Sequence, residues 1–144
     1  MVKIFVYGSL CTGMYNYEHY LKGKVKHTRR AYVKGELYQI QGVRYPALLA
    51  KEAYVAGELM EICDDGIIST LDALEEYIGP EHPDNLYDKK VCTIYNEAKE
   101  EIAEVPVYFY NVRKPSQKNC LGPRIEEQDF VSFYHHVYGG RERM

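Results

Sequence analysis

Hydrophobic residues alternate with polar residues or glycine along several short stretches of the chain. Five segments are rich in β-branched and aromatic residues and are predicted as strands: 3–7, 31–40, 54–62, 87–95 and 104–112. The second and third segments share the pattern Val-x-Gly-Glu-Leu, which places Gly35 and Gly57 inside strands. Glycine at such positions indicates bulges or tight bends, so we expect a strongly curved sheet.

Helical spacing is clearest over residues 66–78, where the apolar positions are Ile67, Ile68, Leu71, Leu74 and Ile78. Asp64 and Asp65 are suited to cap its start, and Gly79-Pro80 is expected to end it. A short helix is predicted over 14–21, and a last helix over 126–138 with Phe130, Phe133, Tyr134 and Val137 on one face and Gly139-Gly140 at its end. Segments 81–86 and 115–123 are expected to be loops. This pattern predicts an α+β fold, a small mixed β-barrel with flanking helices.

Composition narrows the functional classes. The 144 residues suit a single domain over 1–144, and the net charge of −3 argues against a nucleic-acid module. The basic run from Lys22 to Arg30 is expected to be a solvated loop or strand edge. No apolar stretch is long enough for a membrane span. The sequence contains no Cys-x-x-Cys pair, so a zinc site is not expected. We therefore expect a cytoplasmic protein with free thiols and without metal or cofactor, as a monomer or homodimer.

One carboxylate conflicts with the pattern of the 66–78 helix. At about 100° per residue, Glu75 falls inside the apolar arc, whereas Asp72 and Glu76 fall on the polar side. A glutamate that faces a core must be paired, hydrogen-bonded or neutral. Glu75 is then either a general acid/base with a raised pKa, or a residue at the edge of the stripe that reaches back to water.

The first strand ends in the turn Tyr7-Gly8-Ser9-Leu10. Gly8 is able to adopt backbone angles closed to other residues, so that the following N–H groups converge on an anion. A helix that starts near residues 13–17 would strengthen this field. The alternative is a plain turn at the end of a strand.

Four segments in order resemble the gamma-glutamylcyclotransferase-like family, the small Y-G-[ST]-L enzymes of the gamma-glutamylamine cyclotransferase type. They are Phe5-Val6-Tyr7-Gly8-Ser9-Leu10, Tyr45-Pro46-Ala47-Leu48, Val55-Ala56-Gly57-Glu58-Leu59, and Leu71-Asp72-Ala73-Leu74-Glu75 followed by Tyr87. The likeness covers residues 2–95 and extends to the strand around Tyr108-Phe109-Tyr110. Two departures are Glu76, where many relatives have glycine, and Cys11-Thr12, where basic residues are frequent. Residues 111–125 match nothing in the family pattern.

The resemblance implies that Glu75 is the catalytic acid/base. It implies that Tyr7, Gly8, Ser9 and Leu10 line the substrate site, and it extends more weakly to Tyr45, Tyr87 and Tyr110. The implied substrate is a small gamma-glutamyl amine, amino acid or metabolite, from which 5-oxoproline is released.

Three alternatives stay open at this point. The chain could be a binding or regulatory module on the same fold, in which Glu75 pairs with a ligand cation. Cys11 could act as a nucleophile, although none of the five histidines forms a motif with it. The apolar stripe of the last helix could bind a partner, although such a stripe usually belongs to the core.

Overall fold

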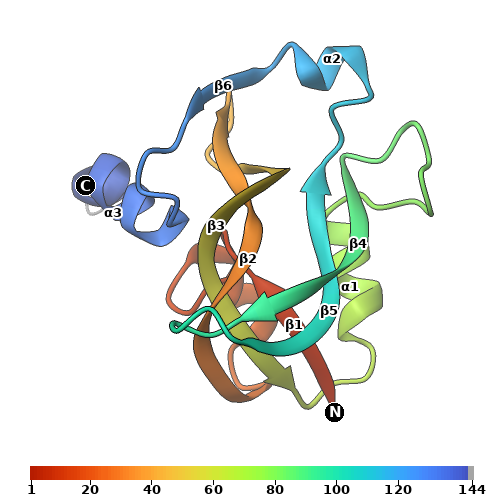
Figure 1. Ribbon diagram of the computed structural model, residues 1–144, viewed down its shortest axis with the longest axis vertical. Coiled ribbons are helices and arrows are strands. Elements are labelled where there is room, and N and C mark those ends of the chain that lie inside the picture. The colour runs from red at the N-terminus through yellow and green to blue at the C-terminus, as the bar shows by residue number, and fades with distance from the viewer. Residues whose placement is uncertain (143–144) are drawn as a thin grey trace.

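The computed structural model describes residues 1–142 as a curved antiparallel sheet with helices at its margins (Figure 1). The strands are β1 (Val2–Val6), β2 (Val25–Ile40), β3 (Ala47–Ile62), β4 (Tyr87–Tyr95), β5 (Glu101–Tyr110) and β6 (Leu121–Arg124). The helices are the π-helix η1 (Tyr17–Leu21), α1 (Ile67–Leu74), α2 (Pro115–Lys118) and α3 (Phe130–Glu142). The predicted α+β class and all five predicted strands are confirmed.

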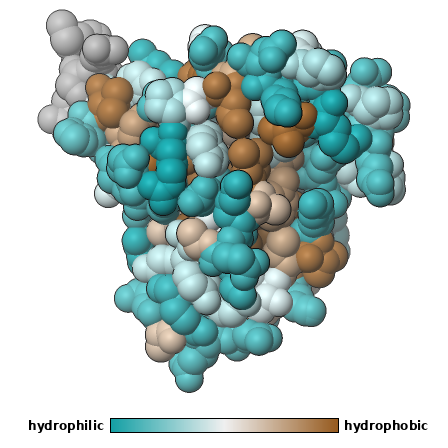
Figure 2. All heavy atoms as spheres, turned by 45° about the horizontal axis from the view of Figure 1, so that its top comes forward, coloured by the Kyte–Doolittle hydropathy of each residue, from teal (hydrophilic) through white to brown (hydrophobic). Residues whose placement is uncertain are grey.

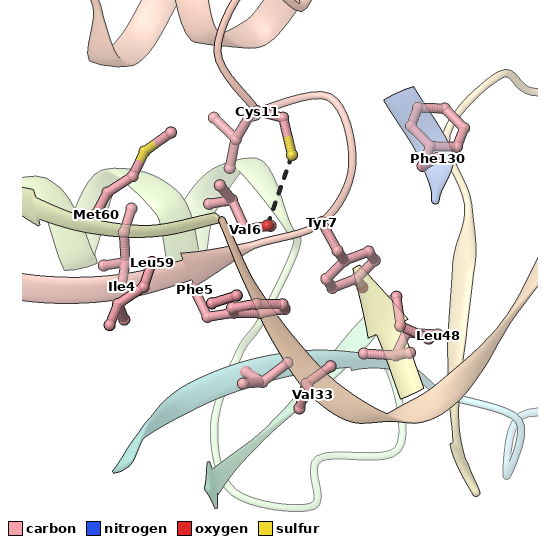
Figure 3. Packing of buried hydrophobic residues seen from close by; sticks show 14 of the residues in the cluster. Ile4, Phe5, Val6, Tyr7, Cys11, Val33, Leu48, Leu59, Met60 and Phe130 are labelled. Carbon is pink, nitrogen blue, oxygen red and sulfur yellow. Dashed lines mark hydrogen bonds between the residues drawn. The ribbon is translucent and has the colours of Figure 1, made fainter. Parts of the chain in front are cut away.

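The sheet runs in the order β1-β3-β2-β4-β5, with β6 paired to β2. It curls around a core that includes Phe5, Val33, Leu48 and Phe130 (Figure 3). The ladder does not close, because β1 and β5 are the two ends of the strand order. The expected barrel is therefore an open, curled sheet, and its two end strands lie near each other beside α1 (Figure 1).

Both Val-x-Gly-Glu-Leu glycines lie where the chain leaves no room for a Cβ: at Gly35 an added Cβ would lie 2.7 Å from Cδ1 of Leu48 and 2.8 Å from the carbonyl oxygen of Leu49. A register shift lies between Lys34 and Glu36, as expected around Gly35, although the extra residues are on β3, between the partners Leu49 and Tyr54. At Gly57 the register with β1 and β2 is regular, so the expected bulge is wrong there. A Cβ at residue 57 would lie 2.3 Å from the carbonyl oxygen of Val6 and 2.6 Å from Cζ of Phe5. Glycine is required because β1 passes this close to β3.

Helix α1 is shorter than the sequence predicts. It ends at Leu74, with Glu75 as its C-cap, and Glu76 then takes a left-handed φ of 51°. Gly79-Pro80 therefore does not end the helix, and Ile78 is exposed instead of belonging to the apolar stripe. No aspartate side chain occupies the N-cap position, which is Gly66, although Asp64 Oδ1 accepts a hydrogen bond from the Gly66 N–H.

The C-terminal part also departs from expectation. The predicted loop over 115–123 contains α2 and most of β6, and Gly139-Gly140 continues α3 instead of ending it. Phe130, Phe133 and Tyr134 are buried in the core, whereas Val137 is 40% exposed. The stripe that the sequence left open as a partner surface is thus largely core.

The basic run lies mainly in the first half of β2, where residues 26–30 are exposed. Figure 2 shows a face on which hydrophobic residues form a narrow, interrupted band between hydrophilic ones. Within residues 1–142, no helix is both long and apolar enough to cross a membrane.

Candidate active site

A small cavity of about 50 Å³ lies between the open edges of the sheet. It is bordered by β1 and the turn after it, by Tyr45-Pro46 before β3, by one face of α1 with Glu75 at its end, and by β4 and β5. Its lining is mostly aliphatic and aromatic. Among the described residues that line it, Glu75 and Lys89 carry the charges, and both therefore face a largely apolar space.

Glu75 lies where the helical arc placed it. Its backbone N–H donates to Leu71 at the end of α1, and its side chain lines the cavity. Burial raises the pKa of the Glu75 carboxyl to about 7. Glu75 is partly buried, whereas Glu76 is exposed, so two adjacent glutamates occupy different environments. A carboxyl group that is half ionised near pH 7 is able to accept and return a proton.

Tyrosine rings surround this carboxyl. Tyr7, Tyr45, Tyr87 and Tyr108 all line the cavity. The pKa of each of these phenols is raised, mainly by burial and in part by the charge of Glu75. The phenols are therefore neutral at neutral pH, and they surround Glu75 with polar groups that carry no charge.

Two of these phenols hold backbone segments in place. Tyr7 donates a hydrogen bond of 2.6 Å to the carbonyl of Tyr108, which joins the end of β1 to β5 across the open seam. Tyr87 donates to the carbonyl of Pro46. The tyrosines therefore shape the cavity as well as line it.

The turn after β1 contributes its backbone to the cavity, but not as expected. Gly8 has no positive φ; instead, its α-carbon lies against Pro46, whose ring carbons would be 3.3 Å from an added Cβ. The N–H groups of Asn16 and Tyr17 donate to the carbonyl of Ser9, so this helix start does not point at an anion. Within residues 1–142, the N–H groups of Ser9 and Leu10 donate to no hydrogen bond of the protein, and both residues line the cavity.

The motif glycine and glutamate of β3 support this turn. Gly57 admits the close approach of Val6, and Glu58 Oε1 accepts hydrogen bonds from the N–H and the hydroxyl of Thr12. The Val-x-Gly-Glu-Leu motif thus positions the turn, whereas the cavity itself is lined by other residues.

Of the residues expected at the site, Tyr110 does not line the cavity. Its ring packs on Tyr87 with centroids 5.7 Å apart, and its hydroxyl donates to the carbonyl of Gln117. Tyr108 and Tyr110 are two residues apart and therefore on the same face of β5, but only Tyr108 reaches the cavity. Tyr110 is paired with Tyr87 across the two strands and packs on the ring of Tyr87.

The sequence reading missed a three-residue cluster at the more open side of the cavity. Lys89 Nζ lies 2.8 Å from Asp72 Oδ1, and Tyr108 also donates its hydroxyl to this oxygen. Asp72 was expected to be an ordinary solvated acid, but its side chain is only 25% exposed. The available signal was the period of two along β4, which puts Lys89 on the same face as Tyr87.

Cys11 is unsuited to nucleophilic chemistry. Its thiol is buried and points to the carbonyl of Val6 at 3.5 Å (Figure 3). Burial raises its pKa well above the ordinary value, so the reactive thiolate is disfavoured. Cys11 also does not line the cavity that contains Glu75.

Comparison with known proteins gives a consistent result. The family described as gamma-glutamyl cyclotransferase, AIG2-like, matches residues 4–132. A gamma-L-glutamyl-butirosin B gamma-glutamyl cyclotransferase from Niallia circulans is 34% identical over 108 residues, which cover 75% of this chain and 67% of the relative. A putative gamma-glutamylcyclotransferase from Methanocaldococcus jannaschii is 34% identical over 140 residues, which cover 92% and 98%.

Solved structures share the fold. An AIG2-like protein from mouse superimposes with a TM-score of 0.66 at 21% identity, covering 88% of this chain and 86% of that one. YkqA from Bacillus subtilis gives 0.66 at 20% identity, with 95% of this chain matched to 42% of the longer protein.

Proposed function

The chain belongs to the gamma-glutamyl cyclotransferase, AIG2-like family, and we propose that it releases 5-oxoproline from a small gamma-glutamyl compound with Glu75 as general acid/base. The observation that carries this proposal is the position of Glu75 in an apolar cavity: a largely buried carboxyl with a pKa of about 7, which shares this cavity with the N–H groups of Ser9 and Leu10, for which residues 1–142 provide no acceptor.

The reaction needs little from the protein besides orientation and proton transfer. The α-amine of the substrate attacks its own γ-carbonyl carbon, a five-membered lactam forms, and the bond from that carbon to the leaving nitrogen breaks. Because the nucleophile is already tethered, a small cavity that selects the folded-back conformer supplies much of the rate enhancement.

Glu75 moves the proton in both directions. The α-ammonium first loses one proton to solvent. The Glu75 carboxylate then takes the second proton as the amine attacks, and the resulting acid gives that proton to the departing nitrogen. A pKa of about 7 keeps both protonation states accessible at neutral pH. An ordinary solvated glutamate would be a weaker base and would rarely be present as the acid.

The turn supplies the electrostatic half of the site. The N–H groups of Ser9 and Leu10 bind a negatively charged oxygen of the glutamyl group, either its α-carboxylate or the oxyanion that develops on the γ-carbonyl. Tyr7, Gly8, Tyr45 and Tyr87 enclose the folded-back glutamyl chain, and Tyr110 supports Tyr87 from behind.

The experiment is a substrate panel. Purified protein is incubated with gamma-glutamyl amino acids, gamma-glutamyl amines and glutathione, and 5-oxoproline is measured by mass spectrometry. We expect release that is proportional to enzyme concentration for at least one class. Binding of panel members without any release of 5-oxoproline would instead support a non-catalytic binding module.

A further inference from the structure

We infer that Lys89 is a specificity residue that binds a carboxylate on the leaving group, so that gamma-glutamyl amino acids are preferred over gamma-glutamyl amines that lack this carboxylate. This inference rests on the proposed cyclotransferase function and names the substrate class of the same cavity.

The side chain of Lys89 borders the cavity, and its ion-pair partner Asp72 lies outside the lining. Both Asp72 oxygens lie within 3.0 Å of Nζ, and Tyr108 donates its hydroxyl to the same carboxylate. The Lys89 ammonium also lies 4.7 Å from the centroid of the Tyr77 ring. These contacts fix the long side chain in one position, so little entropy is lost when a ligand binds to it.

The ammonium retains binding capacity toward the cavity. A lysine ammonium has three N–H donors, and the Asp72 carboxylate accepts from it at 2.8 and 3.0 Å. A donor left for the cavity faces an apolar lining, in which a charge-assisted hydrogen bond is strong. Of the described residues that line the cavity, Lys89 is the one cation, so a substrate anion at this side has a single charged partner.

The position of Lys89 in the cavity indicates that the carboxylate it binds belongs to the leaving group. Lys89 follows Tyr87 by two residues on the same face of β4; Tyr87 is buried, whereas Lys89 is partly exposed. On α1, its partner Asp72 lies about one turn before Glu75. The lactam has to form beside Glu75 and the turn, so the departing half of the substrate extends toward Lys89.

The test compares two substrates that differ by one carboxylate. In gamma-glutamyl-alanine the leaving group carries a carboxylate, and in gamma-glutamyl-ethylamine the same leaving group lacks it. We measure kcat/KM for both with wild type, Lys89→Gln, Lys89→Arg and Lys90→Gln. Lys90 is the matched control, because it is the next residue, is exposed, and does not line the cavity.

We expect wild type and Lys90→Gln to prefer gamma-glutamyl-alanine, and Lys89→Gln to reduce this preference by about 10- to 100-fold, the range of a hydrogen bond between charged groups. Lys89→Arg should restore most of it. The ratio of the two kcat/KM values does not depend on the fraction of folded enzyme, so a partly unfolded variant still gives a valid result.

Two results would overturn the inference while leaving the proposed function intact. One is wild-type turnover of gamma-glutamyl-ethylamine that equals or exceeds that of gamma-glutamyl-alanine. The other is an equal loss of both activities in Lys89→Gln, which would instead assign Lys89 to the α-carboxylate that both substrates share. Absence of 5-oxoproline from every gamma-glutamyl compound would contradict the proposed function itself.

Discussion

Glu75 and Glu76 are neighbours in sequence but occupy different environments: the first caps α1 and lines the cavity, and the second is exposed at a left-handed φ of 51°. The helix ends at Leu74, directly before them, and of the two carboxylates only that of Glu75 lines the cavity. The pair thus provides both the central residue of the account and its matched control.

The pH dependence of activity should reflect the carboxyl of Glu75. Because the ionised form is the base and burial raises its pKa to about 7, kcat/KM should rise with pH and level off above an apparent pKa of about 7. Glu76→Gln should show the same acid limb. A limb near 4.5 in the pH profile would mean that Glu75 is solvated during catalysis or is not the titrating group.

The same burial should cost stability at high pH. The folded-state pKa of Glu75 lies above its unfolded value, so its contribution is most favourable at low pH and is lost as pH rises toward and through 7. Glu75→Gln removes this cost. We expect the variant to match wild type near pH 4 and to exceed it by up to about 3 kcal/mol in the free energy of unfolding at pH 8 and above.

Urea denaturation across this pH range measures the difference. A gap between Glu75→Gln and wild type that stays constant with pH would show that the effect comes from packing and not from ionisation.

Replacement of Glu76 by glycine should stabilise the fold by relieving backbone strain. A non-glycine residue in the left-handed region is strained, and glycine adopts the same conformation without a Cβ clash. We expect Glu76→Gly to raise the free energy of unfolding by about 0.5–1 kcal/mol, after the greater chain entropy of glycine is counted. Glu76→Ala removes the same carboxylate but keeps the strain, so it should give no such gain.

Substitution by alanine should destabilise the fold at one glycine, Gly57 in β3, and stabilise it at another, Gly139 in α3. Gly57→Ala forces a methyl group against Val6 and Phe5 and should lower the free energy of unfolding by about 3 kcal/mol or more. At Gly139, in α3, the nearest heavy atom to an added Cβ is 4.0 Å away, so Gly139→Ala should stabilise by about 0.5–1 kcal/mol. Thermal unfolding with both variants checks the contrast, and a neutral Gly57→Ala would contradict the close approach of β1 to β3.

Local sequence rules located five of the six strands and the orientation of Glu75, but they missed β6 and the first parts of β2 and β3. The apolar spacing of α1 identifies the inner arc even though the helix ends four residues earlier than expected, because the wheel position of Glu75 depends only on the residues before it. The end itself was not foreseeable, since a glutamate in a left-handed conformation carries no compositional signal.

Long-range contacts account for what the sequence missed. Asp72, Lys89 and Tyr108 come from α1, β4 and β5, and only the tertiary fold brings them together. Gly57 looked like a bulge because a glycine within a strand commonly marks one, whereas its reason is the path of β1. Tyr110 matched a family position but packs behind Tyr87, which the alternation of β5 alone does not reveal.

The most direct test of the central claim measures 5-oxoproline release by wild type, Glu75→Gln and Glu76→Gln on the best substrate of the panel. Loss of a general acid/base typically lowers the rate by about 10²–10⁴. We expect such a loss for Glu75→Gln in a folded protein, and near-normal turnover for Glu76→Gln. Near-normal turnover by Glu75→Gln would contradict the central claim.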